Sequence, residues 1–176
     1  AVYHNSSAGD GPTIDLQHCT FADNGRTAVY FYCAAKGYLV VSNCIFSSNP
    51  GWSAHPYHLY LSTASASLRQ LLVFNPDATY YTTLVTAIRR DPLFMDAKAA
   101  NYFLSKNSPA MNAGALGVGT LDPDGTAADL GAYGGPDAAK FWPYPAGGPV
   151  VTSLAADPPA ASQGQTIKIK ASATTR

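Results

Sequence analysis

Two arginines beside an aspartate form the densest group of charged side chains in the sequence. Arg89, Arg90 and Asp91 follow one another directly. A guanidinium donates a fork of hydrogen bonds that matches a carboxylate, so this group could recognise the acidic groups of a uronate polymer. A solvated bend in the chain is the competing interpretation, and we favour it. Arg89 and Arg90 are kept as candidate carbohydrate-binding residues.

An aromatic segment is the second candidate. Trp52, Tyr57 and Tyr60 lie close together in the sequence, interspersed with His55 and His58. Trp and Tyr rings can stack on sugars, and an imidazole can serve as a base near neutral pH. We expect the segment mainly to cover a core as an insertion between strands. Carbohydrate binding is the less favoured interpretation, and in that case we predict that Trp52, Tyr57 and Tyr60 make the contacts.

Other ionisable side chains indicate structural roles. Asp122, Asp124 and Asp129 lack the glutamate and the alternating ligands of an EF-hand calcium loop. Such aspartates commonly bond their own backbone in turns, and we expect that role here. We predict no cofactor and no metal, with a calcium ion at these aspartates as the less favoured alternative. His4 and His18 are isolated, and we expect them to be solvated.

The cysteines suggest neither a zinc site nor a disulfide framework. Cys19, Cys33 and Cys44 are odd in number and contain no C-x-x-C spacing. Cys19 and Cys44 occupy equivalent positions of the repeat described next. We expect them to point into a core as stacked free thiols, and a disulfide between them is sterically conceivable although parallel Cβ vectors disfavour it.

An internal repeat sets the elements that must position these side chains. Apolar residues alternate within each copy, as in strands that send every second side chain into a core. A fixed offset of 25 residues (39 − 14 for the first pair) favours a solenoid of stacked strands over a β-sandwich. The matched positions are Ile14, Leu16, Cys19, Phe21 and Asn24 with Leu39, Val41, Cys44, Phe46 and Asn49.

Other segments show the same alternation on a second face. We expect Val29 and Phe31 to stack against Leu59 and Leu61. No window carries a convincing helical stripe, because Gly, Pro and β-branched residues interrupt it. The sequence therefore predicts an all-β chain of about four coils. Further strands are expected at residues 71–74, 83–88, 92–95 and 102–104.

A series of short motifs follows the repeat. In order, they are DPLF (91–94), NYFL (101–104), NSPAMNAG (107–114), DPDG (122–125) and DLGAY (129–133). This order is similar to the closing segment of pectin-lyase-like β-helix proteins of bacterial surfaces and secretions, and with the repeat the resemblance covers roughly residues 13–135. Gly134 departs from the pattern, since many relatives carry glutamate there. Pro92, Pro109 and the glycines cannot continue a ladder, so we expect a cap that protects the last coil from edge pairing.

Repeat and resemblance together predict a right-handed parallel β-helix (solenoid) with a C-terminal cap and a two-stranded β tail. The resemblance implies an extracellular location among carbohydrates, because many members are polysaccharide lyases, hydrolases or epimerases and others are structural or adhesive. Fold alone does not choose among these activities. The base, cation or paired carboxylates of such a reaction are not clustered in this sequence, so we assign no catalytic residue.

Composition narrows the class of partner. Charged residues make up 12% of the chain, and Lys plus Arg balances Asp plus Glu at 11 each. Without a basic excess we expect no nucleic-acid partner. No apolar stretch approaches the roughly 20 residues that span a bilayer, so we expect no membrane span. The chain begins at Ala1 without a signal sequence, which suggests a mature or excised piece.

The C-terminal part changes character. The run FWPYPAGGP predicts a linker with a boundary near residue 146. Residues 150–154 and 166–173 alternate like strands and are similar to the first two strands of a bacterial Ig-like module. Two strands bury too little surface to persist alone, so we expect them to pair with a strand edge of this chain or of another copy, with truncation of a longer protein as the competing explanation. The two expected parts are residues 1–145 and 146–176.

These observations favour an extracellular structural or surface β-helix module that self-assembles through its β tail and contacts glycans. Its expected partners are the rest of a longer chain, other copies of itself and polysaccharide. Two alternatives stay open: the non-catalytic C-terminal part of a polysaccharide lyase or glycoside hydrolase, and a carbohydrate-binding module. We assign no reaction; a lyase or hydrolase would be the class if the protein is an enzyme.

Overall fold

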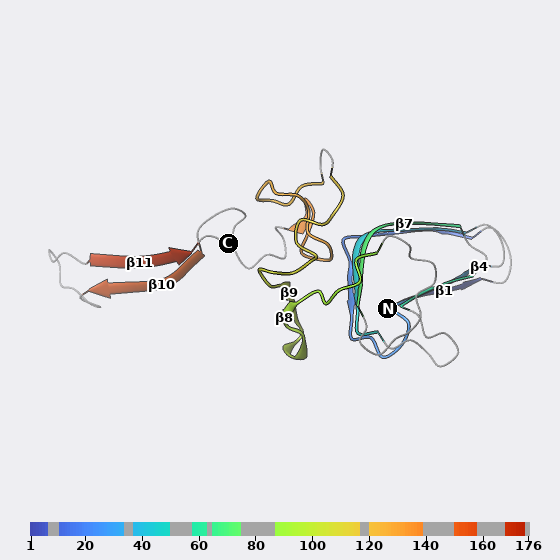
Figure 1. Ribbon diagram of the computed structural model, residues 1–176, viewed down its shortest axis with the longest axis horizontal. Coiled ribbons are helices and arrows are strands. Elements are labelled where there is room, and N and C mark those ends of the chain that lie inside the picture. Colours follow the sequence, from blue (N-terminus) through green and yellow to red (C-terminus); the bar gives the residue numbers. More distant parts are fainter. Residues whose placement is uncertain are drawn as a thin grey trace.

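The chain is all-β in the part that the structure describes (Figure 1). Among these residues the one helical element is a short 3-10 helix, η1 (Ala97–Ala99), and no helix is long and apolar enough to cross a membrane. The expected all-β class is confirmed. The computed structural model describes residues 1–6, 11–33, 37–49, 58–62, 65–74, 87–116, 120–138, 150–157 and 168–174.

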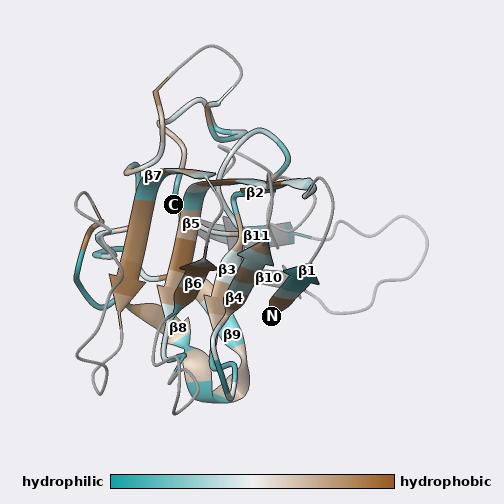
Figure 2. Cartoon of the chain, turned by 90° about the vertical axis from the view of Figure 1, so that its right-hand side faces the viewer, coloured by the Kyte–Doolittle hydropathy of each residue, from teal (hydrophilic) through white to brown (hydrophobic). Residues whose placement is uncertain are grey.

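Two parallel sheets form the N-terminal half. Within each sheet the strands lie side by side and run in the same direction (Figure 2). The first sheet consists of β1 (Val2–Ser6), β4 (Val29–Cys33) and β6 (Leu59–Ser62), in that order. The second consists of β2 (Thr13–Gln17), β3 (Thr20–Ala22), β5 (Tyr38–Ser47) and β7 (Ser65–Phe74), with β2 and β3 following one another along β5.

The strand register confirms the repeat. Ile14 pairs with Leu39, and Phe21 pairs with Phe46, in parallel strands. The rings of Phe21 and Phe46 stack with centroids 5.0 Å apart and planes 12° from parallel. On the first sheet Val29 pairs with Leu59, as the alternation predicted. Each level of the stack, here called a tier, therefore contains one strand of the first sheet and the strand or strands that follow it in the second.

The main core lies between the two sheets. Strand β4 contributes Val29 and Phe31, and β5 contributes Leu39, Val41 and Phe46, all of them fully buried. They share one core because alternate side chains of each strand point to the same face. Burying one such side chain stabilises the fold by about 1.5–3 kcal/mol, so this core dominates the stability of the stacked strands.

Sharp corners bend the strands of the second sheet, and Figure 1 shows the ribbons turning there. His18, Asn43 and Gln70 occupy equivalent positions of successive tiers and have φ of 48°, 54° and 44°; we call them the corner row. Asp23 and Ser48 repeat this left-handed conformation five residues later, with φ of 51° and 53°. This conformation is costly for residues other than glycine, so the stacked neighbours must hold it in place.

The flank segment, residues 87–116 and 120–138, packs on the outer side of β3, β5 and β7. Ile45 and Leu72 point away from the main core and join Leu104, Ala110 and Leu130 in a second core. Backbone contacts reinforce the packing: the Leu130 amide donates to the Ala110 carbonyl at 2.8 Å. The segment therefore forms a second layer against the sheet.

This placement corrects the expected cap over the last coil. Ile88 does pair with Leu72 beside β7, but the contacts of the rest of the segment lie along the flank. The segments expected as coil strands at residues 92–95 and 102–104 instead form an antiparallel hairpin, β8 (Phe94–Asp96) and β9 (Asn101–Leu104). The connection through η1 is far too short for a parallel crossover.

The described residues contain three tiers and the Ile88 bridge, where about four coils were expected. Most of the strand predicted at residues 83–88 falls outside the described residues. In the tail, β10 (Val150–Asp157) and β11 (Lys168–Thr174) pair antiparallel, with an irregularity between Val151 and Ser153. The two strands thus partner each other, and the predicted linker also lies outside the described residues.

Candidate functional site

A column of three tyrosines crosses the outer face of the first sheet. Tyr3, Tyr30 and Tyr60 hold equivalent positions on β1, β4 and β6, so the strand register places each ring over the next. The centroids of Tyr3 and Tyr30 are 4.9 Å apart and those of Tyr30 and Tyr60 are 4.8 Å apart, with planes within 13° of parallel. We call this feature the tyrosine column.

The geometry of the tyrosine column decides what it offers to a ligand. Because the rings cover one another's faces, their edges and hydroxyl groups are what the column presents outward. Tyr3 at the end of the column is 70% exposed. Partial desolvation within the stack, and then the neighbouring phenols, raise the pKa of Tyr30. Its hydroxyl therefore stays protonated at neutral pH and can both donate and accept hydrogen bonds.

The predicted sugar-binding residues are only partly brought together. Tyr60 belongs to the column, whereas Arg89 and Arg90 are exposed at the start of the flank segment, on the other sheet's side. Trp52 and Tyr57 lie outside the described residues. Asp91 accepts a hydrogen bond from the Leu93 amide at 2.8 Å, in agreement with the bend favoured for this segment.

Sequence reasoning missed Tyr3 and Tyr30. Each follows an apolar residue in a short alternating run, and so does Tyr60: the pairs are VY at 2–3, VY at 29–30 and LY at 59–60. That recurrence is a usable signal. It was hidden because the spacing in this sheet changes from tier to tier, unlike the constant offset that identified the repeat.

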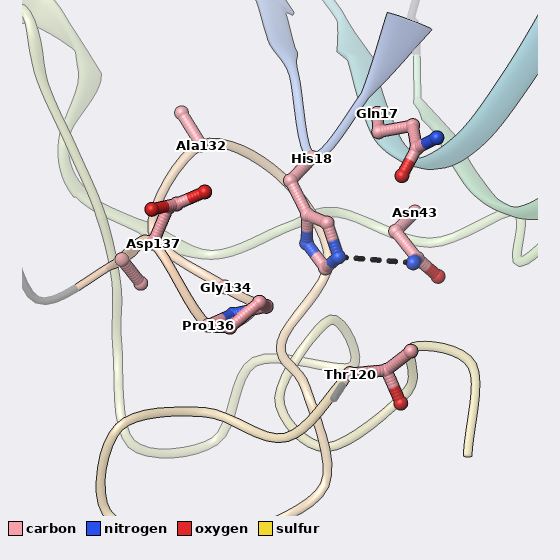
Figure 3. A pocket seen from close by; sticks show the side chains of 9 residues that line it. Gln17, His18, Asn43, Thr120, Ala132, Gly134, Pro136 and Asp137 are labelled. Atoms are coloured by element: carbon pink, nitrogen blue, oxygen red, sulfur yellow. Dashed lines mark hydrogen bonds between the residues drawn. The ribbon is translucent and has the colours of Figure 1, made fainter. Parts of the chain in front are cut away.

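A small pocket lies where the corner row meets the flank segment (Figure 3). Its volume is about 280 Å³. Both His18 and Asn43 of the corner row face it, and residues of the flank segment close the opposite side. The lining residues are Gln17, His18, Asn43, Thr120, Ala132, Gly134, Pro136, Asp137 and Ala138.

Hydrogen bonds define the protonation state of His18. The Asn43 side-chain oxygen accepts from the Ala115 amide at 2.9 Å, so its NH₂ group faces His18 Nε2 at 3.0 Å. Nε2 must then accept, which places the proton on Nδ1 and leaves the ring neutral. Burial lowers the pKa of His18, which also favours the neutral ring. A hydrogen bond with the backbone of Asp129 raises this pKa but has the smaller effect.

The polar groups of the pocket bond mainly to the protein itself. Gln17 donates to Asp15 at 2.8 Å, and the Thr120 hydroxyl donates to the Ala115 carbonyl at 2.9 Å. The ring of His18 packs so closely on Gly135 that a Cβ there would lie 2.7 Å from Nε2. The pocket is thus a joint between sheet and flank segment, and the expectation that His18 is merely solvated was wrong.

Two further histidines are also part of the packing. His58 is 2% exposed, and its Nδ1 lies 3.2 Å from the side-chain nitrogen of Asn49. Asn49 in turn donates to the Phe21 carbonyl at 2.8 Å. Burial lowers the pKa of His58 to about 4, which suits a covering role better than that of an exposed base. His4, expected to be solvated, packs against Phe31 with centroids 5.2 Å apart.

The aspartates of the flank segment bond backbone, as predicted. Asp122 accepts from the amides of Asp129 at 3.0 Å and Gly135 at 2.6 Å, and Asp124 accepts from Thr126 at 3.0 Å. Burial, followed by the charges of Asp129 and Asp124, raises the pKa of Asp122 to about 6 despite these donors. Within the described ranges, no group of three His, Cys, Asp or Glu side chains is arranged to hold a metal ion.

Comparison with known proteins adds no evidence, so the interpretation of the site rests on its geometry. Within the part of the chain that the structure describes, the tyrosine column is the outward feature that gathers predicted and newly found residues, and the pocket is a structural joint. Neither a protein-family model, nor a curated protein, nor a solved structure matches the chain.

Proposed function

We propose that the protein is an extracellular structural module, a right-handed parallel β-helix whose tyrosine column contacts linear polysaccharide. The tyrosine column is the observation that carries this proposal. Stacked strands are separated by about 4.8 Å, so the column offers phenol groups at a regular spacing along one line. A linear polymer with regularly spaced hydroxyl groups is the ligand class that suits such a line.

The chemistry of the column favours a neutral polysaccharide. The raised pKa of Tyr30 keeps the central phenol uncharged at neutral pH, and the adjacent outward positions on the same strands carry no acidic or basic side chain. Hydroxyl and amide groups exchange hydrogen bonds with sugars without the desolvation cost of an ionised side chain. The neighbouring positions are Asn5, Tyr32 and Ser62.

Support for the β-helix comes from the order of the strands. Each tier supplies one strand to the first sheet and then its next strands to the second, the two sheets share one core, and the corner row repeats at each tier. Connections between parallel neighbours in one sheet are right-handed in nearly all proteins. The resemblance of the sequence to pectin-lyase-like proteins favours the same architecture.

Self-assembly through the tail is the second element of the proposal. Among the described residues β10 and β11 pair with each other, and strand exchange with another copy would use an outer edge of this pair. Size measurement with and without residues 149–176 tests this: a larger species that depends on the tail is expected. Monomers of both forms would rule out strand exchange in solution.

Binding to a soluble neutral β-glucan tests the contact with polysaccharide. Tyr30→Ala removes the middle ring and should weaken binding at least tenfold. Tyr38→Ala is the matched control, because Tyr38 is 42% exposed but lies on β5, away from the column. Polygalacturonate is the charged comparison. Unchanged binding of Tyr30→Ala, in a variant whose circular dichroism matches the wild type, would contradict the proposal.

The alternative of a lyase or hydrolase part predicts a different outcome. Release of unsaturated or reducing sugars from either polymer by this chain would move the interpretation to an enzyme. Binding without product release supports the structural module. A carbohydrate-binding module is distinguished by the tail experiment, since it needs no self-assembly.

A further inference from the structure

Two cysteines lie one above the other in adjacent tiers. The register that pairs Thr20 with Ile45 places Cys19 beside Cys44, and the Ile45 amide donates to the Cys19 carbonyl at 2.9 Å. Neighbouring strands hold such Cα atoms about 4.8 Å apart, within the 4.4–6.8 Å range that a disulfide requires. Both side chains are free thiols in the structure.

The sulfur of Cys44 leans toward the tier of Cys19. It lies 3.4 Å from the Cys19 amide nitrogen and 3.5 Å from the Leu16 carbonyl, both in the preceding tier. Parallel Cβ vectors alone would keep two stacked sulfurs apart, and this was the sequence-based argument against a bond between them. Each sulfur also lies 3.2 Å from the carbonyl oxygen two residues earlier in the chain, Gln17 for Cys19 and Ser42 for Cys44, so a side-chain rotation must accompany bond formation.

Access differs between the two thiols. Cys19 is half-buried in the first tier, whereas Cys44 is fully buried in the core. A hydrogen bond with Cys44 lowers the pKa of Cys19 to about 7, against the opposing effects of burial and of Asp15. The same interaction and burial raise the pKa of Cys44. Near neutral pH the accessible sulfur is therefore the partly ionised one, and the buried sulfur keeps its proton.

We propose that Cys19 and Cys44 form an oxidation site that reacts with a peroxide and closes to a disulfide between the first two tiers. The Cys19 thiolate attacks one peroxide oxygen, the O–O bond breaks, and a sulfenic acid and hydroxide form. The Cys44 thiol gives its proton to the hydroxide formed in the first step, and the resulting thiolate attacks the sulfenic sulfur; the S–S bond forms as the S–O bond breaks, and the departing hydroxide takes a proton from solvent to leave as water. Overall, two thiols are oxidised and one peroxide is reduced to two waters.

Cys33 provides an internal control. It is fully buried on β4 in the other sheet, and Gly37 approaches so closely that a Cβ there would lie 2.9 Å from the Cys33 sulfur. Without access to solvent and without a stacked thiol at its position, Cys33 should stay reduced. The inference is independent of the proposed polysaccharide contact.

The experiment treats the reduced protein, residues 1–176, with one equivalent of hydrogen peroxide at neutral pH. Free thiols are counted after denaturation, and peptide mapping locates any bond. We expect the count to fall from three to one, with Cys19 and Cys44 joined, and the Tm to rise until a reducing agent reverses it. Cys33→Ser should lose the same two thiols. In Cys44→Ser, a dimedone probe should trap a sulfenic acid at Cys19.

Three results would overturn the proposal. They are retention of all three thiols by the wild type, a bond that involves Cys33, and bonds only between different molecules. The wild-type measurement alone decides among them, so a variant that fails to fold does not leave the question open.

Discussion

Two outward rows of side chains differ although the same alternation produces both. On the second sheet the row is Thr20, Ile45 and Leu72, and Ile88 continues it. The flank segment covers this row, and Ile45 and Leu72 are fully buried. On the first sheet the corresponding row is the tyrosine column, which remains partly exposed. The chemistry of an outward row therefore tells whether a second layer covers it.

This difference separates stability from recognition. An aliphatic row in water would lose hydrophobic free energy, so the chain supplies a layer over it. Tyrosines tolerate partial exposure, because the ring edge with its hydroxyl remains solvated while the ring faces pack on each other. We therefore expect the covered row to determine stability and the tyrosine column to determine binding.

Replacing one side chain of each row by alanine should give the largest difference in stability between the two rows. Leu72→Ala leaves a cavity under the flank segment and should lower the free energy of unfolding by about 3–5 kcal/mol. Tyr30→Ala loses ring stacking at a partly exposed site and should cost about 1 kcal/mol. Urea denaturation of both variants measures the difference. Equal losses would mean that the flank segment does not protect its row.

Lowering the pH should change the stability contributions of the core and of the flank segment in opposite directions. The folded pKa of His58, about 4, lies below its usual 6.5, so its contribution falls as pH drops from 6.5 to 4, by about 3 kcal/mol. Asp122 has the opposite sign: its pKa rises from 3.8 to about 6, so its contribution is lost as pH rises through that window. His18, with a lowered pKa, adds to the effect of His58.

Variants at these positions should change the slope of stability against pH between 4 and 6. His58→Gln removes the larger contribution that rises with pH, so stability should rise less steeply with pH than in the wild type. Asp122→Asn removes the opposing term, so stability should rise more steeply than in the wild type. Urea midpoints over this range give both slopes. Identical slopes in the two variants would contradict the assignment of opposite signs.

Adding a methyl group to Gly131, where the flank segment meets the second sheet, should have an intermediate effect on stability. Gly131 has φ of 89°, and a Cβ there would lie 2.5 Å from the Thr20 hydroxyl and 2.8 Å from Ile45 Cδ1. Gly131→Ala combines backbone strain with a clash and should cost about 2–3 kcal/mol. Gly125→Ala is the matched control, since its φ is 83° but the space around it is open. Only the strain, about 1 kcal/mol, should remain in the control.

The smallest effect concerns the tyrosine column at alkaline pH. The raised pKa of Tyr30 means that folding favours the protonated phenol. Its contribution is therefore complete below pH 10 and is lost as pH rises through the folded pKa. Tyr30→Phe should flatten the loss of stability above pH 10, as followed by thermal unfolding. An unchanged alkaline profile would show that stacking does not perturb this phenol.

The sequence predicted the parallel pairing because the repeat combines alternation with a constant offset. Ile14 with Leu39 and Phe21 with Phe46 illustrate this, and both pairs are in register. The flank placement could not be predicted in the same way. It depends on contacts such as Ala132 with Thr20, which join residues far apart in the chain and follow no local period.

The site was only partly predictable for a related reason. Tyr60 attracted attention through its aromatic neighbours, whereas Tyr3 and Tyr30 acquire meaning only when the strands are stacked. His18 looked isolated in the sequence, but its partner Asn43 lies one tier away. Asp122 was correctly expected to bond backbone, because short aspartate turns are a local feature.

The left-handed corners also indicate which stretches of the chain can accept inserted residues and which cannot. Positions 18 and 23 are separated by the same number of residues as positions 43 and 48, so this stretch has one permitted length. The offset between paired strands nevertheless differs: Val2 pairs with Val29, and Val29 pairs with Leu59. The additional residues therefore lie outside the cornered stretch, and a guest peptide grafted between two such stretches, rather than within one, should leave the stack intact.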